Sequence, residues 1–288
     1  MFFYNTYGVE LMAEEKENCT HDCSTCGVEG CESRGKIEKL KPHEGTSFQK
    51  IIAVISGKGG VGKSLVTSLL AVSLINAGHS VALLDADVTG PSAARAFGVD
   101  DVGATGDENG IFPIEAKRGM PLLGANNLLE TPTTPIVWRG SLISNLVTQM
   151  FTDVCYGEKE VLLIDMPPGT GDVPLTVFQS LPISGAIVVA TPQDLVNEVV
   201  AKSINMAKLM KVKLLGIVEN MAYIKCPHCG EKIRVFGQNN GDLTKATGVP
   251  VLDELPIDPK LTQLIDAGNI EEYKGDYLAH AVEAILKD

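Results

Sequence analysis

A glycine-rich segment that directly follows an apolar run is the part of the chain best suited to bind phosphate. Residues 56–64 read Ser-Gly-Lys-Gly-Gly-Val-Gly-Lys-Ser, after the apolar residues 51–55 and before a helical pattern. Glycines let backbone N–H groups turn toward a polyphosphate that a Cβ would keep away, and the helix dipole favours negative charge. A purely structural turn is the alternative, but it gives Lys58 and Lys63 no function. We therefore expect nucleotide binding by Gly57, Lys58, Gly59, Gly60, Val61, Gly62, Lys63 and Ser64.

Within this loop, two side chains have a chemical role that follows from their type. The Lys63 ammonium can reach the β- and γ-phosphates of ATP, and the Ser64 hydroxyl suits Mg²⁺. Both predictions depend on the loop lying between a strand and a helix, because only that setting presents the two side chains to the same phosphates.

Carboxylates follow two further apolar runs. Residues 81–84 lead into Asp85-Ala86-Asp87, and residues 161–164 end in Asp165, as in a Walker B element. Asp85 and Asp87 are two apart, so on a strand end they point the same way and could hold Mg²⁺ and its waters or orient an attacking water. Capping of the following turn explains Asp85 equally well, whereas for Asp87 chemistry is the preferred interpretation.

The segment after Asp165 has the composition of a nucleotide-sensing loop. Residues 166–172 read Met-Pro-Pro-Gly-Thr-Gly-Asp. Prolines restrict the loop, and glycines allow it to approach a γ-phosphate, which suits a switch that senses hydrolysis. A rigid structural turn is the competing explanation.

Seven cysteines lie mostly in tight groups, which in a reducing compartment indicates metal ligation rather than disulfides. Cys226 and Cys229 supply two thiolates, whereas iron–sulfur and structural zinc sites usually need four ligands. One chain thus provides half a site, and a twofold dimer would provide the rest. A zinc site completed by His228 and a redox dithiol are the alternatives.

The amino-terminal cysteines could form a site within one chain. Cys19, Cys23, Cys26 and Cys31 place four soft ligands within thirteen residues, enough for an iron–sulfur cluster or for zinc. Cys155 stands alone in an apolar stretch and is expected to be a small buried hydrophobe.

Apolar runs alternate with helical patterns from residue 48 onward. Strands are predicted at residues 51–55, 81–84, 161–164, 186–190, 214–218 and 251–255. Helices are predicted near residues 63–77, 141–152, 175–180, 195–210, 261–267 and 277–286. Near-continuous apolar strands that alternate with helices indicate an α/β fold, a mostly parallel sheet with helices on both faces. The chemically loaded segments all follow strands, where ligands bind in such sheets.

The remaining segments give the domain organisation. We expect residues 1–47 to form a cysteine-rich, partly disordered arm and residues 48–288 to form the nucleotide-binding ATPase domain. Within that domain, residues 103–135 are rich in Gly and Pro and are expected to form an inserted hairpin and loop.

Composition excludes several classes of function. The formal net charge of −12 argues against a nonspecific nucleic-acid binder, and no run is as long as a transmembrane helix. Residues 1–11 lack the basic flank of a secretory signal, and Met12 could be the natural start. We therefore expect a cytoplasmic protein that binds neither nucleic acid nor membrane.

Several motifs together resemble a known family. The extra lysine, Lys58, is typical of the deviant Walker A class, which includes MinD, ParA, the arsenite pump and the nitrogenase iron protein. Residues 85–92, residues 165–172 and Cys226-Pro227-His228-Cys229 resemble the Mrp/ApbC family of iron–sulfur cluster carrier ATPases. The resemblance extends from about residue 48 to the C-terminus.

The resemblance implies roles for individual residues. Lys58 would reach the partner's nucleotide across a dimer interface, and Asp87 would position the hydrolytic water. Asp165 would act through Mg²⁺, with Ser64 and Asp85 near the same ion. The nucleotide base would be contacted by Asn220, with Pro256 and Asp258 in a second loop near it.

The resemblance also implies an activity. Cys226 and Cys229 would bridge a [4Fe–4S] cluster between two copies, and slow ATP hydrolysis would gate its transfer to apo-proteins through residues 167–172. A MinD/ParA-like positioning ATPase with zinc-bound cysteines is the alternative. An electron-transfer reductase like the nitrogenase iron protein fits less well, because its cluster cysteines lie in different loops.

Overall fold

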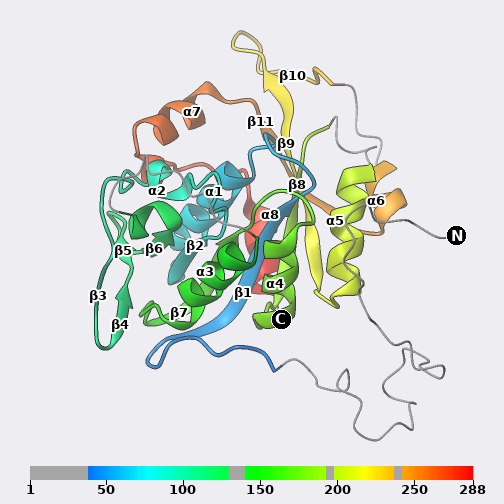
Figure 1. Cartoon of the computed structure of the whole chain (residues 1–288). Helices are drawn as coiled ribbons and strands as arrows, with labels where there is room; N and C mark the ends of the chain where they lie inside the picture. The colour runs from blue at the N-terminus through cyan, green and yellow to red at the C-terminus, as the bar shows by residue number, and fades with distance from the viewer. Residues whose placement is uncertain (1–37, 130–139, 193–197, 237–241, 288) are drawn as a thin grey trace, which may run out of the picture. The chain divides into compact units, whose positions relative to one another are not determined.

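The structure is a computed structural model that describes residues 38–129, 140–192, 198–236 and 242–287. The part from Lys39 onward forms one compact unit. Its centre is a nine-stranded sheet in which strands follow the spatial order β10-β9-β8-β1-β7-β2-β6-β5, with β11 also paired to β9 (Figure 1). The predicted boundary between arm and ATPase domain stays a prediction.

The central strands are parallel. β1 pairs in parallel with both β7 and β8, β2 with β7 and β6, and β9 with β8 and β11. The strands of this sheet are β1 (Ser47–Ser56), β2 (Val81–Asp85), β5 (Ile114–Glu115), β6 (Pro121–Gly124), β7 (Glu158–Asp165), β8 (Gly185–Ala190), β9 (Leu214–Lys225), β10 (Lys232–Ile233) and β11 (Val251–Pro256). All six strands predicted from apolar runs are present, because such runs are what a sheet covered on both faces requires.

Helices cover both faces of the sheet, as predicted. The helices are α1 (Lys63–Asn76), α2 (Ala93–Ala96), α3 (Gly140–Thr152), α4 (Asp172–Ser180), α5 (Glu198–Leu209), α6 (Asp242–Thr247), α7 (Pro259–Asp266) and α8 (Ala279–Leu286), with short 3₁₀ turns η2 (Ala125–Leu128) and η3 (Ile270–Glu272). One apolar cluster joins the sheet to α3, α4 and α5, and a second joins it to α1, α2, α7 and α8. Alternate residues of β1 divide between the two clusters, Ile51 and Ala53 in one and Ile52 and Val54 in the other.

Residues 103–135 are only partly the predicted insertion. A hairpin is present, formed by β3 (Thr105–Asp107) and β4 (Gly110–Phe112). The expectation of a loop beyond it is wrong for residues 114–124, because β6 extends the main sheet in parallel beside β2 and β5 adds an antiparallel edge strand. A proline and a glycine bound β6, and its four residues are too few to give a clear pattern.

The parallel strands end at one edge of the sheet, and the loops there bring distant segments together. The loops after β1, β2 and β7 are the glycine-rich loop, residues 86–92 and residues 166–171. In the described ranges, no helix combines the length and the apolarity needed to cross a bilayer.

Candidate functional site

The glycine-rich loop has the backbone shape that its sequence predicts. Gly60 and Gly62 have φ of 81° and 79°, in the left-handed region where glycine avoids the cost of a Cβ. Gly62 is the N-cap of α1, and its carbonyl accepts a hydrogen bond from the Val66 N–H at 3.0 Å. The loop, including Lys58 and Ser64, borders a cavity of about 210 Å³. Asp87 lines the same cavity. The cavity therefore lies at the N-terminus of a helix, a position that favours phosphate.

A buried charge pair links this loop to the end of β7. The Lys63 ammonium donates to Oδ1 of Asp165 at 2.7 Å, and the two side chains are 6% and 0% exposed. The Thr67 hydroxyl, one helical turn after Lys63, also donates to Oδ1 of Asp165 at 2.8 Å. These two donors fix the carboxylate of Asp165 at the base of the cavity.

Asp165 and Ser64 provide ligands that fit a hard divalent cation. Oδ2 of Asp165 is buried and has no hydrogen-bond partner within the described ranges, an arrangement that is costly without a further ligand. The Ser64 hydroxyl lies 3.4 Å from the Lys63 ammonium and lines the cavity. Carboxylate and hydroxyl oxygens together with phosphate oxygens are the ligands that Mg²⁺ prefers in nucleotide sites. The donor set therefore fits Mg²⁺ bound to a nucleotide.

Both carboxylate oxygens of Asp85 accept hydrogen bonds from backbone N–H groups. Its Oδ1 accepts from the Asp87 N–H at 3.1 Å, and its Oδ2 accepts from the N–H groups of Ser92 and Ala93 at 2.9 and 3.0 Å. Complete burial and the nearby charge of Asp165 raise the pKa of Asp85 to about 7. This geometry supports the capping interpretation of Asp85, and its predicted place at Mg²⁺ stays a prediction.

Asp87 points into the cavity. Its side chain is 13% exposed, and Oδ2 lies 3.9 Å from the Lys63 ammonium. The Thr89 hydroxyl donates to Oδ1 at 3.1 Å, which restricts the carboxylate's rotation. Of the two carboxylates at the end of β2, only Asp87 is therefore available to contact a substrate. Asp85 differs from it because both of its oxygens already accept hydrogen bonds from backbone N–H groups.

The loop after β7 packs directly against the glycine-rich loop. The Gly169 N–H donates to the Ser56 carbonyl at 2.9 Å, and Gly169 has a φ of 86°. Pro168 lines the cavity, and a Cβ on Gly59 would lie 3.9 Å from its ring. A change in the phosphates bound in the cavity would therefore act directly on the loop after β7.

Asn220 contacts the glycine-rich loop from strand β9, which is separated from β1 by β8. Its side chain is 1% exposed, and Nδ2 donates to the Val61 carbonyl at 2.9 Å. Pro256 and Asp258 lie at the carboxyl end of β11, beside β9. Asp258 is the N-cap of α7, accepting from the Lys260 N–H at 3.0 Å, and the Tyr277 hydroxyl donates to its other oxygen at 3.3 Å. Contact of these three residues with a base stays a prediction.

Cys226 and Cys229 lie in the tight turn between β9 and β10. The Gly230 N–H donates to the Cys226 carbonyl, and the Cys226 N–H donates to the Glu231 carbonyl, both at 2.9 Å. Cys229 is exposed and Cys226 partly so. Backbone N–H groups of Cys229 and His228 stabilise the thiolate and lower the pKa of Cys226. A thiolate is the form that binds metal.

The predictions for the other cysteines have different outcomes. The predicted ligands Cys19, Cys23, Cys26 and Cys31 lie outside the described residues. Cys155 is half-buried, and its Sγ lies 3.5 Å from Nδ1 of His43, so the expectation of an apolar buried cysteine is wrong. Where the structure describes the chain, no three His, Cys, Asp or Glu side chains come together as a metal site. The pair at Cys226 and Cys229 thus has no third ligand of these types within the described part of its own chain.

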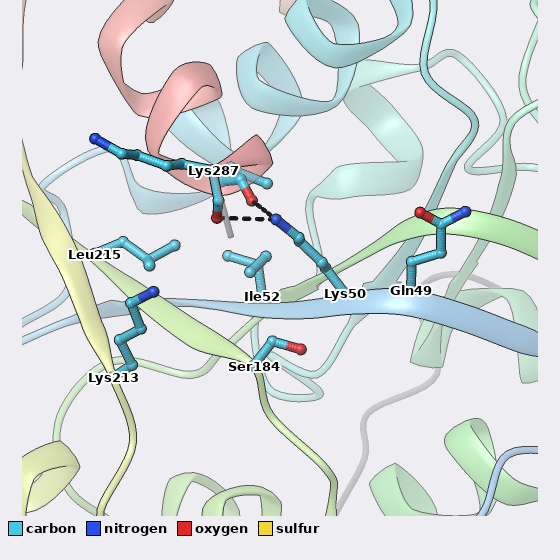
Figure 2. Close-up of a pocket in the computed structure, with 8 residues that line it drawn as sticks. Gln49, Lys50, Ile52, Ser184, Lys213, Leu215 and Lys287 are labelled. Carbon is cyan, nitrogen blue, oxygen red and sulfur yellow. Dashed lines mark hydrogen bonds between the residues drawn. The ribbon is translucent and has the colours of Figure 1, made fainter.

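A second cavity, of about 180 Å³, lies elsewhere on β1 and borders the end of α8 (Figure 2). Lys50 reaches across it and donates to the carbonyls of Ile285, Leu286 and Lys287 at 3.0, 2.8 and 2.9 Å. These carbonyls are the unpaired acceptors at a helix C-terminus, so Lys50 caps α8. The cavity lining contains no carboxylate or cysteine, and we assign the cavity a structural role.

Two features, one in the nucleotide site and one near the cysteine hairpin, were not predicted from the sequence. Thr67 could have been found, because it lies four residues after Lys63 on the same face of α1. The pair between Arg234, after β10, and Glu254, in β11, could not, since no periodic signal joins positions 20 residues apart.

A family model matches most of the chain. Residues 47–288 match the ParA model, described as NUBPL iron-transfer P-loop NTPase. The match covers every described segment of the site, from β1 to α8.

Curated relatives are about two-fifths identical to the chain over the residues that align. The iron-sulfur cluster carrier protein of Clostridium perfringens is 41% identical over 259 residues, 87% of this chain and 90% of the relative. That of Methanocaldococcus jannaschii is 40% identical over 257 residues, 87% of this chain and 89% of the relative.

Solved structures share the fold. A nucleotide-binding protein from Archaeoglobus fulgidus in complex with ADP has a TM-score of 0.72 and 42% identity, covering 80% of this chain and 91% of that one. The Pyrococcus horikoshii septum site-determining protein MinD, complexed with Mg-ADP, has a TM-score of 0.57 and 21% identity, covering 83% and 95%. At that identity, the likeness to MinD shows the fold alone.

Proposed function

The chain belongs to the ParA-type family of iron-transfer P-loop NTPases, and from that premise we propose that it is an ATP-hydrolysing iron–sulfur cluster carrier. Two copies would hold a [4Fe–4S] cluster between them and pass it to apo-proteins. The cluster is the cargo of this reaction rather than a resident cofactor, and ATP with Mg²⁺ is the nucleotide substrate.

One observation carries the proposal: a tight hairpin turn presents two exposed or part-exposed thiols, Cys226 and Cys229, and one of them has a lowered pKa. Two thiolates per chain are half of the four that a [4Fe–4S] cluster needs. Because a twofold axis brings the same loop of two copies together, a dimer would complete the site. Exposure suits a carrier, since an acceptor protein must reach the cluster.

The nucleotide site would work through positioning and charge. Lys63 would neutralise the phosphates, and Ser64 and Asp165 would hold Mg²⁺, which supplies further charge neutralisation when bound. Asp87 would orient the attacking water and accept its proton. Lys58, exposed at the cavity mouth, would reach the nucleotide of the second copy. Residues 167–172 would respond to loss of the γ-phosphate, because Gly169 is already hydrogen-bonded to Ser56.

The amino-terminal cysteines would bind a second cluster or zinc. We propose a cytoplasmic location, because a reducing compartment keeps Cys226 and Cys229 available as thiolates. The MinD/ParA-like alternative depends on a likeness of fold, and none of the described contacts favours it.

The test is anaerobic reconstitution of the full chain with iron and sulfide, read out by metal content, visible absorption and molar mass in solution. With Cys19, Cys23, Cys26 and Cys31 all changed to serine, we expect about two irons per chain in a dimer, since two chains share one cluster. Cys226→Ser in that background should remove the iron and leave ATP binding intact. Cys155→Ser is the matched control and should change neither.

Two results would overturn the proposal. One is a colourless protein that holds zinc at Cys226 and Cys229 after anaerobic reconstitution. The other is a monomer that binds iron fully without a second copy.

A further inference from the structure

Strand β9 joins the two halves of the proposed function. Asn220 donates a hydrogen bond to the Val61 carbonyl of the glycine-rich loop, and six residues later, directly after β9 ends at Lys225, Cys226 begins the thiol turn. Asn220 is packed tightly against that loop, since a Cβ on Gly62 would collide with its amide nitrogen. A movement of the loop must therefore displace Asn220 or break this contact.

Between these two points, β9 carries an irregularity. Glu219 pairs with Glu254 and Tyr223 pairs with Pro256, so four steps along β9 match only two steps along β11. Met221, inside this bulge, has a φ of 57°, in the left-handed region, where a non-glycine residue is strained. Bulges of this kind are common beside active sites, where they re-aim the strand that follows. Here the strand that follows carries the thiols.

One contact joins the hairpin of β9 and β10 to β11, and a second lies between the two strands of the hairpin. The Arg234 guanidinium, just after β10, donates to Oε2 of Glu254 at 2.7 Å. The pair is only 25% and 27% exposed, so it is better shielded from solvent than a surface ion pair. The ammonium of Lys232 lies 4.3 Å from the centre of the Tyr223 ring. Glu254 pairs in register with Glu219, the residue before Asn220.

We propose that β9 is the mechanical link between nucleotide and cluster, and that Arg234 is a positioning residue that makes the hairpin follow it. The inference rests on the proposed function and specifies its route. A shift at Val61 moves Asn220, the bulge at Met221 converts that shift into a tilt of the strand end, and the Arg234–Glu254 pair carries β10 with it. The tilt changes the spacing of the thiols of two copies, and so how firmly a cluster is held. In Figure 1 the hairpin of β9 and β10 extends beyond the neighbouring strands, so a small tilt at its base is amplified at the turn.

The first test is hydrogen exchange of the backbone amides in residues 223–236 of the full chain, with and without a non-hydrolysable ATP analogue. We expect the analogue to change exchange in the wild-type hairpin, and Arg234→Gln to reduce that change by about twofold to thirtyfold, the range for residues that modulate coupling. Glu254→Gln should do the same. The charge-swapped pair, Arg234→Glu with Glu254→Arg, should restore part of the response, and Arg234→Lys, which keeps the charge, should restore more.

The matched control is Arg95→Gln, which removes an ion pair to Asp266 that is 3.8 Å long and about two-thirds exposed on both sides. It should leave the exchange of the hairpin unchanged. Thermal unfolding separates loss of coupling from loss of fold, and Glu254→Gln serves if Arg234→Gln does not fold. An unresponsive wild-type hairpin, or a response in Arg234→Gln equal to that of wild type, overturns the inference.

The second test distinguishes the inference from the function on which it rests. With cluster loaded anaerobically, Arg234→Gln should keep iron binding but lose most of the ATP dependence of transfer to an apo-protein acceptor. Wild-type protein that takes up no iron would refute the carrier function, and hydrogen exchange would still decide whether the hairpin responds to nucleotide. Transfer that responds to ATP equally in wild type and Arg234→Gln would refute the link while leaving the carrier function standing.

Discussion

Nζ of Lys63 lies 2.7 Å from Oδ1 of Asp165, and both side chains are almost fully buried at the base of the nucleotide cavity. The pair joins the first turn of α1 to the end of β7, so it couples the glycine-rich loop to the strand that leads into residues 166–171. A buried pair of this kind is costly to break on one side, because the remaining charge has no partner. The Lys63–Asp165 contact therefore stabilises the fold and also belongs to the chemistry of the nucleotide site.

The first prediction concerns Lys63→Ala. It should lower the rate of ATP hydrolysis by about a hundredfold or more, because it removes a cation preorganised for the phosphates. It should also lower the free energy of unfolding by about 3 kcal/mol, since the buried charge of Asp165 is left without its cation. Hydrolysis assays and denaturant unfolding measure the two effects. Lys58→Ala is the control: it changes an exposed lysine of the same loop and should not alter stability. Wild-type hydrolysis in Lys63→Ala would contradict the assignment.

The second prediction compares two glycines of the same loop. Gly60→Ala and Gly62→Ala both force alanine into the left-handed region, at a cost of about 1 kcal/mol each. A methyl group at Gly60 meets nothing within 4 Å, whereas one at Gly62 meets the Asn220 amide. Gly62→Ala should therefore cost about 1–3 kcal/mol more in unfolding free energy and weaken ATP binding further.

Asn220→Ala provides the control for that comparison, because it removes the group that the new methyl would strike. The double variant of Gly62→Ala and Asn220→Ala should recover part of the stability lost by Gly62→Ala alone. Equal losses for Gly60→Ala and Gly62→Ala would show that Asn220 yields at no cost, and would remove the tight contact on which its coupling role depends.

Much of the fold follows from local pattern. The strands at the core were predictable because a parallel sheet covered on both faces needs unbroken apolar runs. The phosphate loop was predictable because Gly60 and Gly62 serve a backbone shape that few other residues adopt. By contrast, β6 runs only from Pro121 to Gly124, and a segment that short gives no period to read.

The different roles of the carboxylates of Asp85 and Asp87 were harder to predict from the sequence. Asp85 and Asp87 have the same chemistry and the same strand end, and only the three-dimensional path of residues 92 and 93 gives Asp85 its backbone donors. The Arg234–Glu254 pair depends likewise on how β10 folds back toward β11. Contacts of this type are set by tertiary packing, which no short-range pattern encodes.

The third prediction is a pH dependence of stability at α8. Nδ1 of His280 donates to Oδ1 of Asp253 at 2.8 Å, and that hydrogen bond together with the carboxylate's charge raises the pKa of His280. A raised pKa means that the folded state favours the protonated histidine. The stabilisation is therefore complete below the ordinary histidine pKa of about 6.5 and is lost as pH rises through the higher folded value.

Melting temperatures of wild type and His280→Gln test this sign. The difference should favour wild type near pH 5.5 and vanish near pH 8.5, on either side of the histidine titration at about 6.5. Asp253→Asn is the control. The asparagine oxygen can still accept the hydrogen bond that the Asp253 carboxylate accepts from the Ala281 N–H at 2.7 Å, so the capping of the helix should be kept. The variant has lost the carboxylate charge, so the dependence of stability on histidine protonation should disappear. A difference that grows with pH would reverse the assignment.

The fourth prediction separates binding from chemistry at Asp87. Asp87→Asn keeps the size of the side chain and its place near Lys63 but removes the negative oxygen that would orient and deprotonate water. It should lower kcat by about 10²- to 10⁴-fold, the range for loss of a general base, with little change in the affinity for ATP. Single-turnover hydrolysis and equilibrium binding of a fluorescent ATP analogue measure the two quantities separately.

Thr89→Val is the matched control, because it removes only the hydroxyl that donates to Oδ1 of Asp87 at 3.1 Å. A base that is present but less well oriented should lose much less, about tenfold or under in kcat, roughly the worth of one ordinary hydrogen bond. If Asp87→Asn instead weakens ATP binding and leaves kcat near wild type, then Asp87 acts on the phosphates through Lys63, from which it is separated by 3.9 Å. In that case the water must be oriented by another group of the cavity, and Lys58 of the second copy would be the next to test.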